Sequence, residues 1–434
     1  MIAFMSILIK NGTIITQNQN RDIIQGSLYI EENKIVEISQ NNINVEADTE
    51  IDASGQLVIP GLINTHTHLP MTLLRGYGDD MILSEWLQTR IWPVEAKLTA
   101  ESVKTGSELG LLEMMKSGTT TFFDMYFFEE TIAEAVDALG MRAVLGFAFI
   151  DHGTPQYSSD VLFDKAEDFV KKYHTHSRIT PGLAPHGTYT CGPDSLRKVR
   201  VLADKYHIPI QIHCAETRDE VYDVKDQYGK RPIAQLQDNG LLASDVVLAH
   251  CGWITKNEIT EMKKQNVRVS HCPVSNMKIA TGGFAPVPEM IDAGICVSLG
   301  TDGAASNNTL DMFETMKFTA LLHKQHRWNP KVVPAQMVFD FSTINGAKAL
   351  GLEENIGSIE EGKRADIVLI DFNTPRLTPC HDPISHIVYA VQGSDVQTTI
   401  VDGNIVYENY SVQVIDEQRV LTNACEQAKV LTNS

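Results

Sequence analysis

The feature that most constrains the fold is a regular alternation of strand-like and helix-like segments through the middle of the chain. Eight apolar runs of strand length alternate with stretches of helical spacing. The strand-like runs lie at residues 57–64, 118–124, 142–150, 178–184, 208–213, 245–250, 266–271 and 295–301. Nearly continuous apolar strands separated by helices indicate a parallel sheet covered by helices. Eight such units predict an α/β fold, a closed (β/α)8 TIM barrel, with its functional residues at the carboxyl ends of the strands.

Both ends of the chain carry shorter alternating patterns that do not belong to the barrel. They lie at residues 6–16, 26–32 and 34–38, and again at 365–371, 398–401 and 404–408. The last pair flanks Asp402-Gly403, a tight-turn sequence. We therefore expect a small discontinuous β-sandwich domain made from residues 1–56 and 365–434, and a barrel domain that spans residues 57–364.

Potential metal ligands and acids follow the carboxyl ends of six of the eight strands. His66 and His68 come after the first, and residues i and i+2 of an extended strand share a face. The others are His186, His213, Glu216, His250, His271 and Asp302. Any one of these histidines taken alone can be a hydrogen-bonded core residue. Their shared position at strand ends favours a metal site.

The chemistry of catalytic metal sites selects the ligands. A divalent ion such as zinc binds neutral imidazole nitrogens and a carboxylate and keeps one position open for water. The set that satisfies this count is His66, His68, His213 and Asp302. We expect zinc, with iron(II) and manganese(II) as alternatives, because all three accept these ligands.

Two further observations argue for a single ion held by this set. Cys214, Cys251 and Cys272 each follow a histidine, so they should point to the opposite strand face as small buried apolar residues. Binuclear hydrolases of this architecture bridge their ions with a carboxylated lysine, and residues 178–190 contain no lysine.

Several segments together resemble the amidohydrolase superfamily. They are PGLINTHTH at 60–68, QIHCAET at 211–217, LAHC at 248–251 and GTDGAASNN at 300–308. With the arm at 73–95 and LDMFETMK at 310–317, nearly the whole chain looks like the 5'-methylthioadenosine/S-adenosylhomocysteine deaminases, which are relatives of the triazine and guanine deaminases. The resemblance implies hydrolytic deamination of an adenosine-type nucleoside to its inosine analogue and ammonia.

The resemblance also implies roles for particular residues. Asp302 would accept the proton of the attacking water, and Glu216 would protonate the substrate ring and pass a proton to ammonia. His250 would hydrogen-bond the attacking water or the intermediate. The implied substrate contacts are Trp86 on the purine, Glu95 and His186 on the ribose, and Ser306 near the tail. The structural alternatives are a helix-capping charge at Glu216, a packing residue at Trp86 and a surface charge at Glu95.

One position departs from the resembled pattern. Phe147 stands where these deaminases carry an arginine for the amino-acid carboxylate of S-adenosylhomocysteine, and no arginine occurs at residues 143–177. A carboxylate without this partner loses about 1.5–3 kcal/mol of charge-assisted hydrogen bonding. We expect S-adenosylhomocysteine to be disfavoured and an uncharged tail, as in 5'-methylthioadenosine, adenosine or 5'-deoxyadenosine, to be preferred.

The composition of the chain limits the classes of molecule that it can bind. A formal net charge of −19 argues against binding to nucleic acid or an anionic membrane, and favours a small-molecule substrate. Seven cysteines, an odd number, indicate reduced thiols in a cytoplasmic protein, and the N-terminus shows neither a signal peptide nor a membrane span. The resemblance implies a homo-oligomer, a dimer or tetramer.

Two other functions stay open at this point. One is hydrolysis of a different ring, such as a cyclic amide, a chlorinated triazine, guanine or a pterin. The other is a barrel without catalytic activity that serves as a binding protein.

Overall fold

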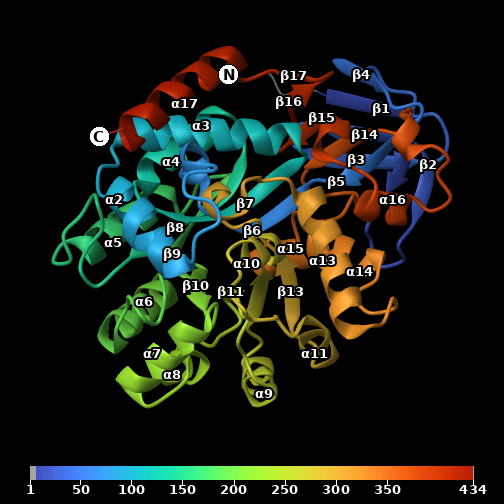
Figure 1. Ribbon diagram of the computed structural model, residues 1–434. Coiled ribbons are helices and arrows are strands. Elements are labelled where there is room, and N and C mark those ends of the chain that lie inside the picture. The colour runs from blue at the N-terminus through green and yellow to red at the C-terminus, as the bar shows by residue number, and fades with distance from the viewer. Residues whose placement is uncertain (1–5, 434) are drawn as a thin grey trace.

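The computed structural model describes residues 6–433, and its centre is an eight-stranded parallel barrel (Figure 1). The strands pair in chain order: β6 (Leu62–Thr67), β7 (Thr119–Tyr126), β8 (Arg142–Phe149), β9 (Ile179–Pro185), β10 (Ile210–Cys214), β11 (Val246–His250), β12 (Arg268–His271) and β13 (Cys296–Leu299). Their residues are almost entirely buried, as expected of a parallel sheet covered by helices. The TIM-barrel prediction is confirmed. Residues 1–5, at the N-terminus expected to lack a leader, lie outside the described residues.

The barrel closes between its first and last strands through hydrogen bonds at their carboxyl ends. The backbone N–H of Asp302 donates to the carbonyl of His66 over 3.0 Å. The Thr65 hydroxyl donates to the Leu299 carbonyl over 2.9 Å. This closure brings His66 and Asp302, which are 236 positions apart in the chain, next to each other.

Helices surround the barrel at the places where the sequence has helical spacing. They are α3 (Ala100–Lys116), α4 (Glu129–Ala138), α5 (Leu162–Tyr173), α6 (Pro193–Tyr206), α7 (Arg218–Tyr228), α8 (Pro232–Asp238), α9 (Lys256–Lys264), α11 (Val287–Asp292), α13 (Met312–Arg327), α14 (Ala335–Phe341) and α15 (Ile344–Leu350). Short helices α10 (Pro273–Lys278) and α12 (Ala304–Asn307) follow β12 and β13. The arm after β6 consists of η1 (Leu69–Leu74), α1 (Leu83–Trp86), η2 (Leu87–Ile91) and α2 (Trp92–Glu95).

Both chain ends contribute strands to a second, mixed sheet at one side of the barrel (Figure 1). Its strands are β1 (Ser6–Ile15), β2 (Ile23–Glu31), β3 (Lys34–Ser39), β4 (Thr49–Asp52), β5 (Gln56–Pro60), β14 (Ile367–Asp371), β15 (Val396–Val401), β16 (Asn404–Glu408) and β17 (Ser411–Val412). This sheet has its own apolar cluster, which includes Ile7, Leu28 and Ile367. The expected turn between β15 and β16 has positive φ at Asp402 and Gly403. Helix α16 (Pro383–Tyr389) packs on α13 and α14, and α17 (Glu417–Thr432) packs on α3.

The apolar run at residues 57–64, expected as one strand, is two strands in two different sheets. β5 pairs with β1 and β14 in the mixed sheet, whereas β6 pairs with β7 in the barrel. Gly61 separates them, and a Cβ atom there would lie 2.1 Å from the Thr120 hydroxyl oxygen. The chain therefore crosses between the sheets at a position where only glycine fits. The domain division at residue 57 stays a prediction.

Candidate functional site

Four histidine rings and one carboxylate meet at the carboxyl ends of the barrel strands. His66 and His68 come from the end of β6, His213 from β10, His250 from β11, and Asp302 from the loop after β13. The ring centroid of His66 lies 4.9 Å from the centroids of His68 and His213 and 5.4 Å from that of His250. Three separate strand ends and one loop thus point their side chains to one small volume.

Each of these four rings is oriented by a hydrogen bond at its Nδ1 atom. The Nδ1 of His68 lies 2.6 Å from the carbonyl oxygen of Met125, and that of His213 lies 2.7 Å from the carbonyl oxygen of His186. A carbonyl oxygen only accepts, so these Nδ1 atoms carry a proton, and in the neutral form of each ring the lone pair lies on Nε2. Side-chain amides orient the other two rings: Gln211 Oε1 lies 2.9 Å from His66 Nδ1, and Asn276 Oδ1 lies 2.9 Å from His250 Nδ1. All four Nε2 atoms are thereby available as ligands.

The carboxylate of Asp302 is held between the histidines and two hydroxyl groups. Its Oδ1 lies 3.5 Å from His66 Nε2 and 3.2 Å from His68 Nε2. Its Oδ2 accepts hydrogen bonds from Ser275 over 2.6 Å and from Ser306 over 2.9 Å. Burial works to raise the pKa of Asp302, but its close contacts with the His66 and His68 rings hold that pKa well below the usual range. The group is therefore an anion inside the site.

These residues fit a divalent metal ion. The Nε2 atom of His66 is buried without a hydrogen-bond partner, which is costly unless a ligand completes it. Burial lowers the pKa of His66 to about 4, so the ring is neutral, as a metal ligand must be. Two ligand groups have all their donor atoms within 4.8 Å of one another: His66, His68 and His213, and His66, His250 and Asp302. The expected ligand set is thus brought together, and His250 lies beside it.

Glu216 lies at the edge of this cluster as a mostly buried carboxyl group. Its Oε2 atom is 3.9 Å from His250 Nε2, and its side chain is 13% exposed. Burial, with a smaller contribution from the charge of Asp302, raises the pKa of Glu216 to about 8. Glu216 is therefore a carboxylic acid near neutral pH rather than a solvated charge at a helix start.

His186 lies beside the cluster and forms part of its support. Besides accepting the His213 hydrogen bond through its carbonyl, it places its ring centroid 4.8 Å from that of His213. Its Nδ1 lies 3.1 Å from the Thr190 hydroxyl. Burial lowers the pKa of His186 to about 4, so this ring is neutral as well.

The arm brings one of its two expected substrate residues to the cluster. Glu95 accepts a hydrogen bond from the Tyr126 hydroxyl over 2.9 Å, and the Tyr126 ring centroid lies 6.2 Å from that of His68. Trp86 instead packs within the arm, where its indole N–H donates to the Tyr77 carbonyl over 3.2 Å. Trp86 is only 6% exposed, so its ring is buried within the arm in this conformation.

Phe147 faces helix α5 rather than the histidine rings. Its ring stacks on Tyr157 with centroids 6.1 Å apart, and the Phe169 centroid on α5 lies 5.8 Å away. A small hollow beside it is lined by Tyr126, Phe127, Phe128, Glu129, Phe147, Ala148, Thr154, Gln156 and Tyr157. This lining contains no lysine or arginine, so a negatively charged group has no cation there.

The expectation that His271 shares the site is wrong. Its Nε2 atom lies 3.2 Å from the Nε2 atom of His323 on α13, on the helix-facing side of β12. The preceding residue, Ser270, occupies the inward face, because it hydrogen-bonds the Thr65 hydroxyl inside the barrel. Alternation along the strand therefore directs His271 away from the cluster.

Sequence reasoning missed three residues that orient the cluster. Gln211 lies two positions before His213, and its amide spans from the Thr65 carbonyl to the His66 ring. Ser275 and Asn276 lie on α10, just after the end of β12. The sequence signal for Ser275 and Asn276 is a pair of small polar residues four and five positions beyond the end of a barrel strand.

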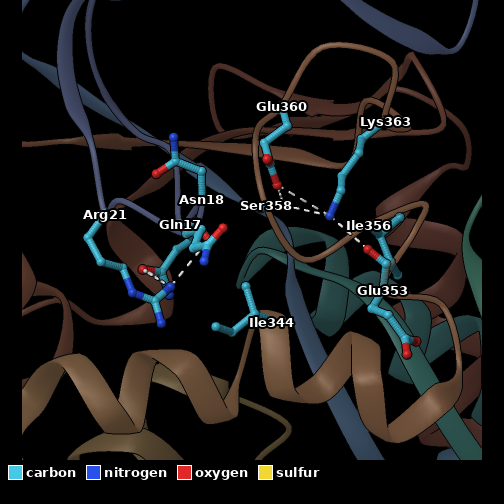
Figure 2. A pocket seen from close by; sticks show the side chains of 10 residues that line it. Gln17, Asn18, Arg21, Ile344, Glu353, Ile356, Ser358, Glu360 and Lys363 are labelled. Atoms are coloured by element: carbon cyan, nitrogen blue, oxygen red, sulfur yellow. Dashed lines mark hydrogen bonds and ion pairs between the residues drawn. The ribbon is translucent and has the colours of Figure 1, made fainter.

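A larger hollow lies away from this cluster, beside the loop between β1 and β2. It has a volume of about 320 Å³, and Figure 2 shows Arg21 and Lys363 projecting into it from opposite sides. Both cations are already paired: Arg21 with Asp340 over 2.8 Å, and Lys363 with the Ser358 hydroxyl over 2.7 Å. We therefore place the chemistry at the histidine cluster.

Comparison with known proteins gives the family. The model of the amidohydrolase family matches residues 57–406. The chain belongs to the amidohydrolase family. Family members related to this amidohydrolase include the 5'-deoxyadenosine deaminase of Methanosarcina mazei, 46% identical over 428 residues that cover 98% of each chain. The 5-methylthioadenosine/S-adenosylhomocysteine deaminase of Thermococcus kodakarensis is 48% identical over 404 residues, 93% of this chain and 94% of that protein.

The solved structure of another protein has the same architecture as this amidohydrolase. The adenosine deaminase of Xanthomonas campestris with bound zinc superimposes with a TM-score of 0.96 at 33% identity, covering 99% of both chains. Among residues 6–433, we find no helix with the length and apolar character needed to cross a membrane. All seven cysteines are free thiols, and Cys214, Cys251 and Cys272 are fully buried, as expected.

Proposed function

We propose that this amidohydrolase is a hydrolytic deaminase of adenosine-type nucleosides. The observation that carries the proposal is the position of Glu216, a buried acid beside His250 and next to a set of metal ligands. Amide hydrolysis needs no acid for a substrate ring nitrogen, whereas deamination of a purine does. The names of the two deaminase relatives, which match 98% and 93% of the chain, support this choice.

One divalent ion would be held by the expected set, which is His66, His68, His213 and Asp302. When bound, the ion supplies a water made acidic enough to attack at neutral pH. We propose zinc, because the donor set is three imidazoles and one carboxylate and because the Xanthomonas campestris structure contains zinc.

The side chains then move the protons. Asp302, held as an anion, accepts a proton from the attacking water as its oxygen bonds to the ring carbon that carries the amino group. Glu216 donates its proton to the adjacent ring nitrogen, and His250 hydrogen-bonds the incoming oxygen. The proton that Asp302 took from water then passes to the amino group, the new hydroxyl group gives its remaining proton to Glu216, and the C–N bond breaks. Ammonia leaves, the ring carbonyl forms, and both carboxyl groups return to their starting states.

The nucleoside contacts are proposed from family resemblance together with the geometry. Glu95, fixed by Tyr126 near His68, would bind ribose hydroxyl groups, and His186 would contact the same sugar. Trp86 would border the purine from inside the arm, and Ser306 would lie near the substrate tail. We propose an uncharged tail, because the aromatic surroundings of Phe147 offer a carboxylate no cation.

The first test is release of ammonia by the zinc-loaded protein. The panel is 5'-methylthioadenosine, 5'-deoxyadenosine, adenosine, S-adenosylhomocysteine, guanine, a pterin and a chlorotriazine. We expect turnover of the neutral adenosines and at least about tenfold lower kcat/KM for S-adenosylhomocysteine, the fold-change that a lost charge-assisted hydrogen bond implies. Turnover only of guanine, pterin or triazine would overturn the nucleoside proposal, and no turnover with metal bound would favour a binding protein.

We also propose that the protein acts in the cytoplasm as a homo-oligomer. Free thiols in all seven cysteines are compatible with a reducing compartment. Light scattering of the purified chain tests the oligomeric state, and a fluorescent fusion tests the location.

A further inference from the structure

Two barrel helices begin with the same four-residue capping pattern but use it differently. Helix α9 starts with Thr255 and has Glu258 three residues later, and the Glu258 carboxylate accepts the N–H of Thr255 over 2.7 Å. This is the usual reciprocal cap. Helix α7 starts with Thr217 and has Glu220 at the same position, and the Thr217 hydroxyl accepts the Glu220 N–H. The side chain of Glu220, however, does not return to its own cap residue.

The Glu220 carboxylate reaches past the cap to the two residues that precede it. Its Oε1 accepts the N–H of Ala215 over 2.9 Å, and its Oε2 accepts the N–H of Glu216 over 2.7 Å. Glu220 is 6% exposed, and the hydrogen-bond partners of its carboxyl group are these two amides and the Thr188 hydroxyl, 3.4 Å from Oε1. Both oxygens therefore serve the backbone of the segment between β10 and α7.

That segment has a strained backbone. Ala215 has a φ of +49°, in the left-handed region that residues with a Cβ rarely adopt. Its carbonyl also accepts the N–H of Trp253 over 2.9 Å. The turn at Ala215 directs the next side chain, Glu216, towards His250. A conformation of this kind persists only where neighbouring groups hold it, and Glu220 supplies two of the bonds that do so.

We propose that Glu220 is a positioning residue for proton transfer by Glu216. The inference rests on the proposed deaminase function and deepens it, since it assigns the placement of the acid to a buried carboxylate one helical turn away. Glu220 contacts neither the histidine rings nor Asp302 through any hydrogen bond found among residues 6–433. Its hydrogen bonds therefore act on the site through the backbone of Glu216, beside a direct charge interaction with Glu216 and His250.

The test compares E220Q with the matched variant E258Q. The amide oxygen of a glutamine at position 220 can accept one of the two backbone N–H groups. Its NH2 group is a donor, so it cannot accept the other N–H, and that hydrogen bond is lost. For E220Q we expect kcat to fall by about 10- to 100-fold with KM changed less than about threefold, because general acid catalysis contributes about 10²–10⁴-fold. For E258Q, which perturbs the reciprocal cap of α9 away from the cluster, we expect both constants within about twofold of wild type.

A double-mutant cycle with E216Q separates positioning from general damage. In the E216Q background the additional change E220Q should lower kcat by less than about threefold, because the group that it positions is already gone. Equal effects of E220Q in both backgrounds, or wild-type kcat in E220Q, would overturn the inference. If E220Q does not fold, E220D, whose shorter side chain cannot reach both amides, takes its place. Failure of the wild-type protein to deaminate any nucleoside would instead overturn the proposed function.

Discussion

At the scale of single residues, the site contains two carboxyl groups with opposite properties. Asp302 lies between histidine rings and two serine hydroxyl donors and stays ionised. Glu216 is buried close to that negative charge, and its pKa is raised to about 8. When the surroundings shift the pKa values of two neighbouring carboxyl groups in opposite directions, one group can act as the base and the other as the acid.

The acid role of Glu216 predicts both a variant effect and a pH profile. E216Q keeps the shape of the side chain without a proton to donate, so kcat should fall by about 10²–10⁴-fold. In wild type the active protonated form is present below pH 8 and is lost as the pH rises through about 8, so kcat/KM should decline there. Steady-state kinetics between pH 6 and pH 10 check this. A wild-type decline that persists unchanged in E216Q would assign it to another group.

Metal removal distinguishes the histidines inside the cluster from the one outside it. Chelation should abolish deamination, and with the metal at about a hundred times its Kd its removal should cost about 3 kcal/mol of stability. H66A should not regain zinc when reloaded, whereas H271A should bind one zinc per chain, because His271 faces α13. Metal analysis after gel filtration measures both. Loss of zinc in H271A at intact fold would contradict the assignment.

At the scale of elements, the arm after β6 is a set of short helices attached to the barrel at a few polar points. Tyr126 at the end of β7 holds Glu95 on α2, and Lys278 on α10 holds Asp79 over 2.7 Å. Burial raises the pKa of Glu95. The arm therefore carries a polar substrate contact to the barrel mouth without belonging to the barrel.

The ribose contact of the arm predicts a substrate-dependent effect. E95Q should raise KM for adenosine by about tenfold, the effect of losing one hydrogen bond to a charged group. KM for 2',3'-dideoxyadenosine should be the same in E95Q and wild type, because that substrate has no hydroxyl groups for residue 95. Kinetics with the two nucleosides check this, and an equal rise for both would indicate general distortion of the arm.

At the scale of the whole molecule, a buried charge cluster joins the two sheets. Arg142 at the start of β8 lies 2.8 Å from Asp366, just before β14, and 2.9 Å from Asp402 in the β15–β16 turn. Asp366 also accepts the N–H of Asp402. The arginine is 6% exposed, so its removal would leave the buried carboxylates of Asp366 and Asp402 without this positive charge.

Removal of Arg142 should therefore destabilise the entire chain. We expect R142M to lower the free energy of unfolding by about 3–5 kcal/mol, as for other broken buried ion pairs. The control is R178M, because Arg178 pairs with the largely exposed Asp137 and such surface pairs contribute about 0–1 kcal/mol. Urea unfolding followed by circular dichroism measures both, and equal losses would contradict a special role for the buried cluster.

The barrel was predictable because each buried strand is a separate apolar run with a helix after it. The break at Gly61 was not, because residues on both sides are equally apolar and only the packing against Thr120 reveals it. His271 was misplaced because a one-residue step on a strand reverses the face. Ser275 and Asn276 could not be assigned because their partners, Asp302 and His250, lie 27 and 26 positions away in the chain.

The pairing of β5 with β14 has a consequence for biosynthesis. About 300 residues separate these strands, so at about 5–20 residues per second the ribosome needs about 15–60 s between them. During that time β1, β2 and β5 have left the exit tunnel, but the partner strand that covers β5 has not been made. The nascent chain carries an open sheet edge throughout, and the mixed sheet can only be completed after the last barrel strand has emerged.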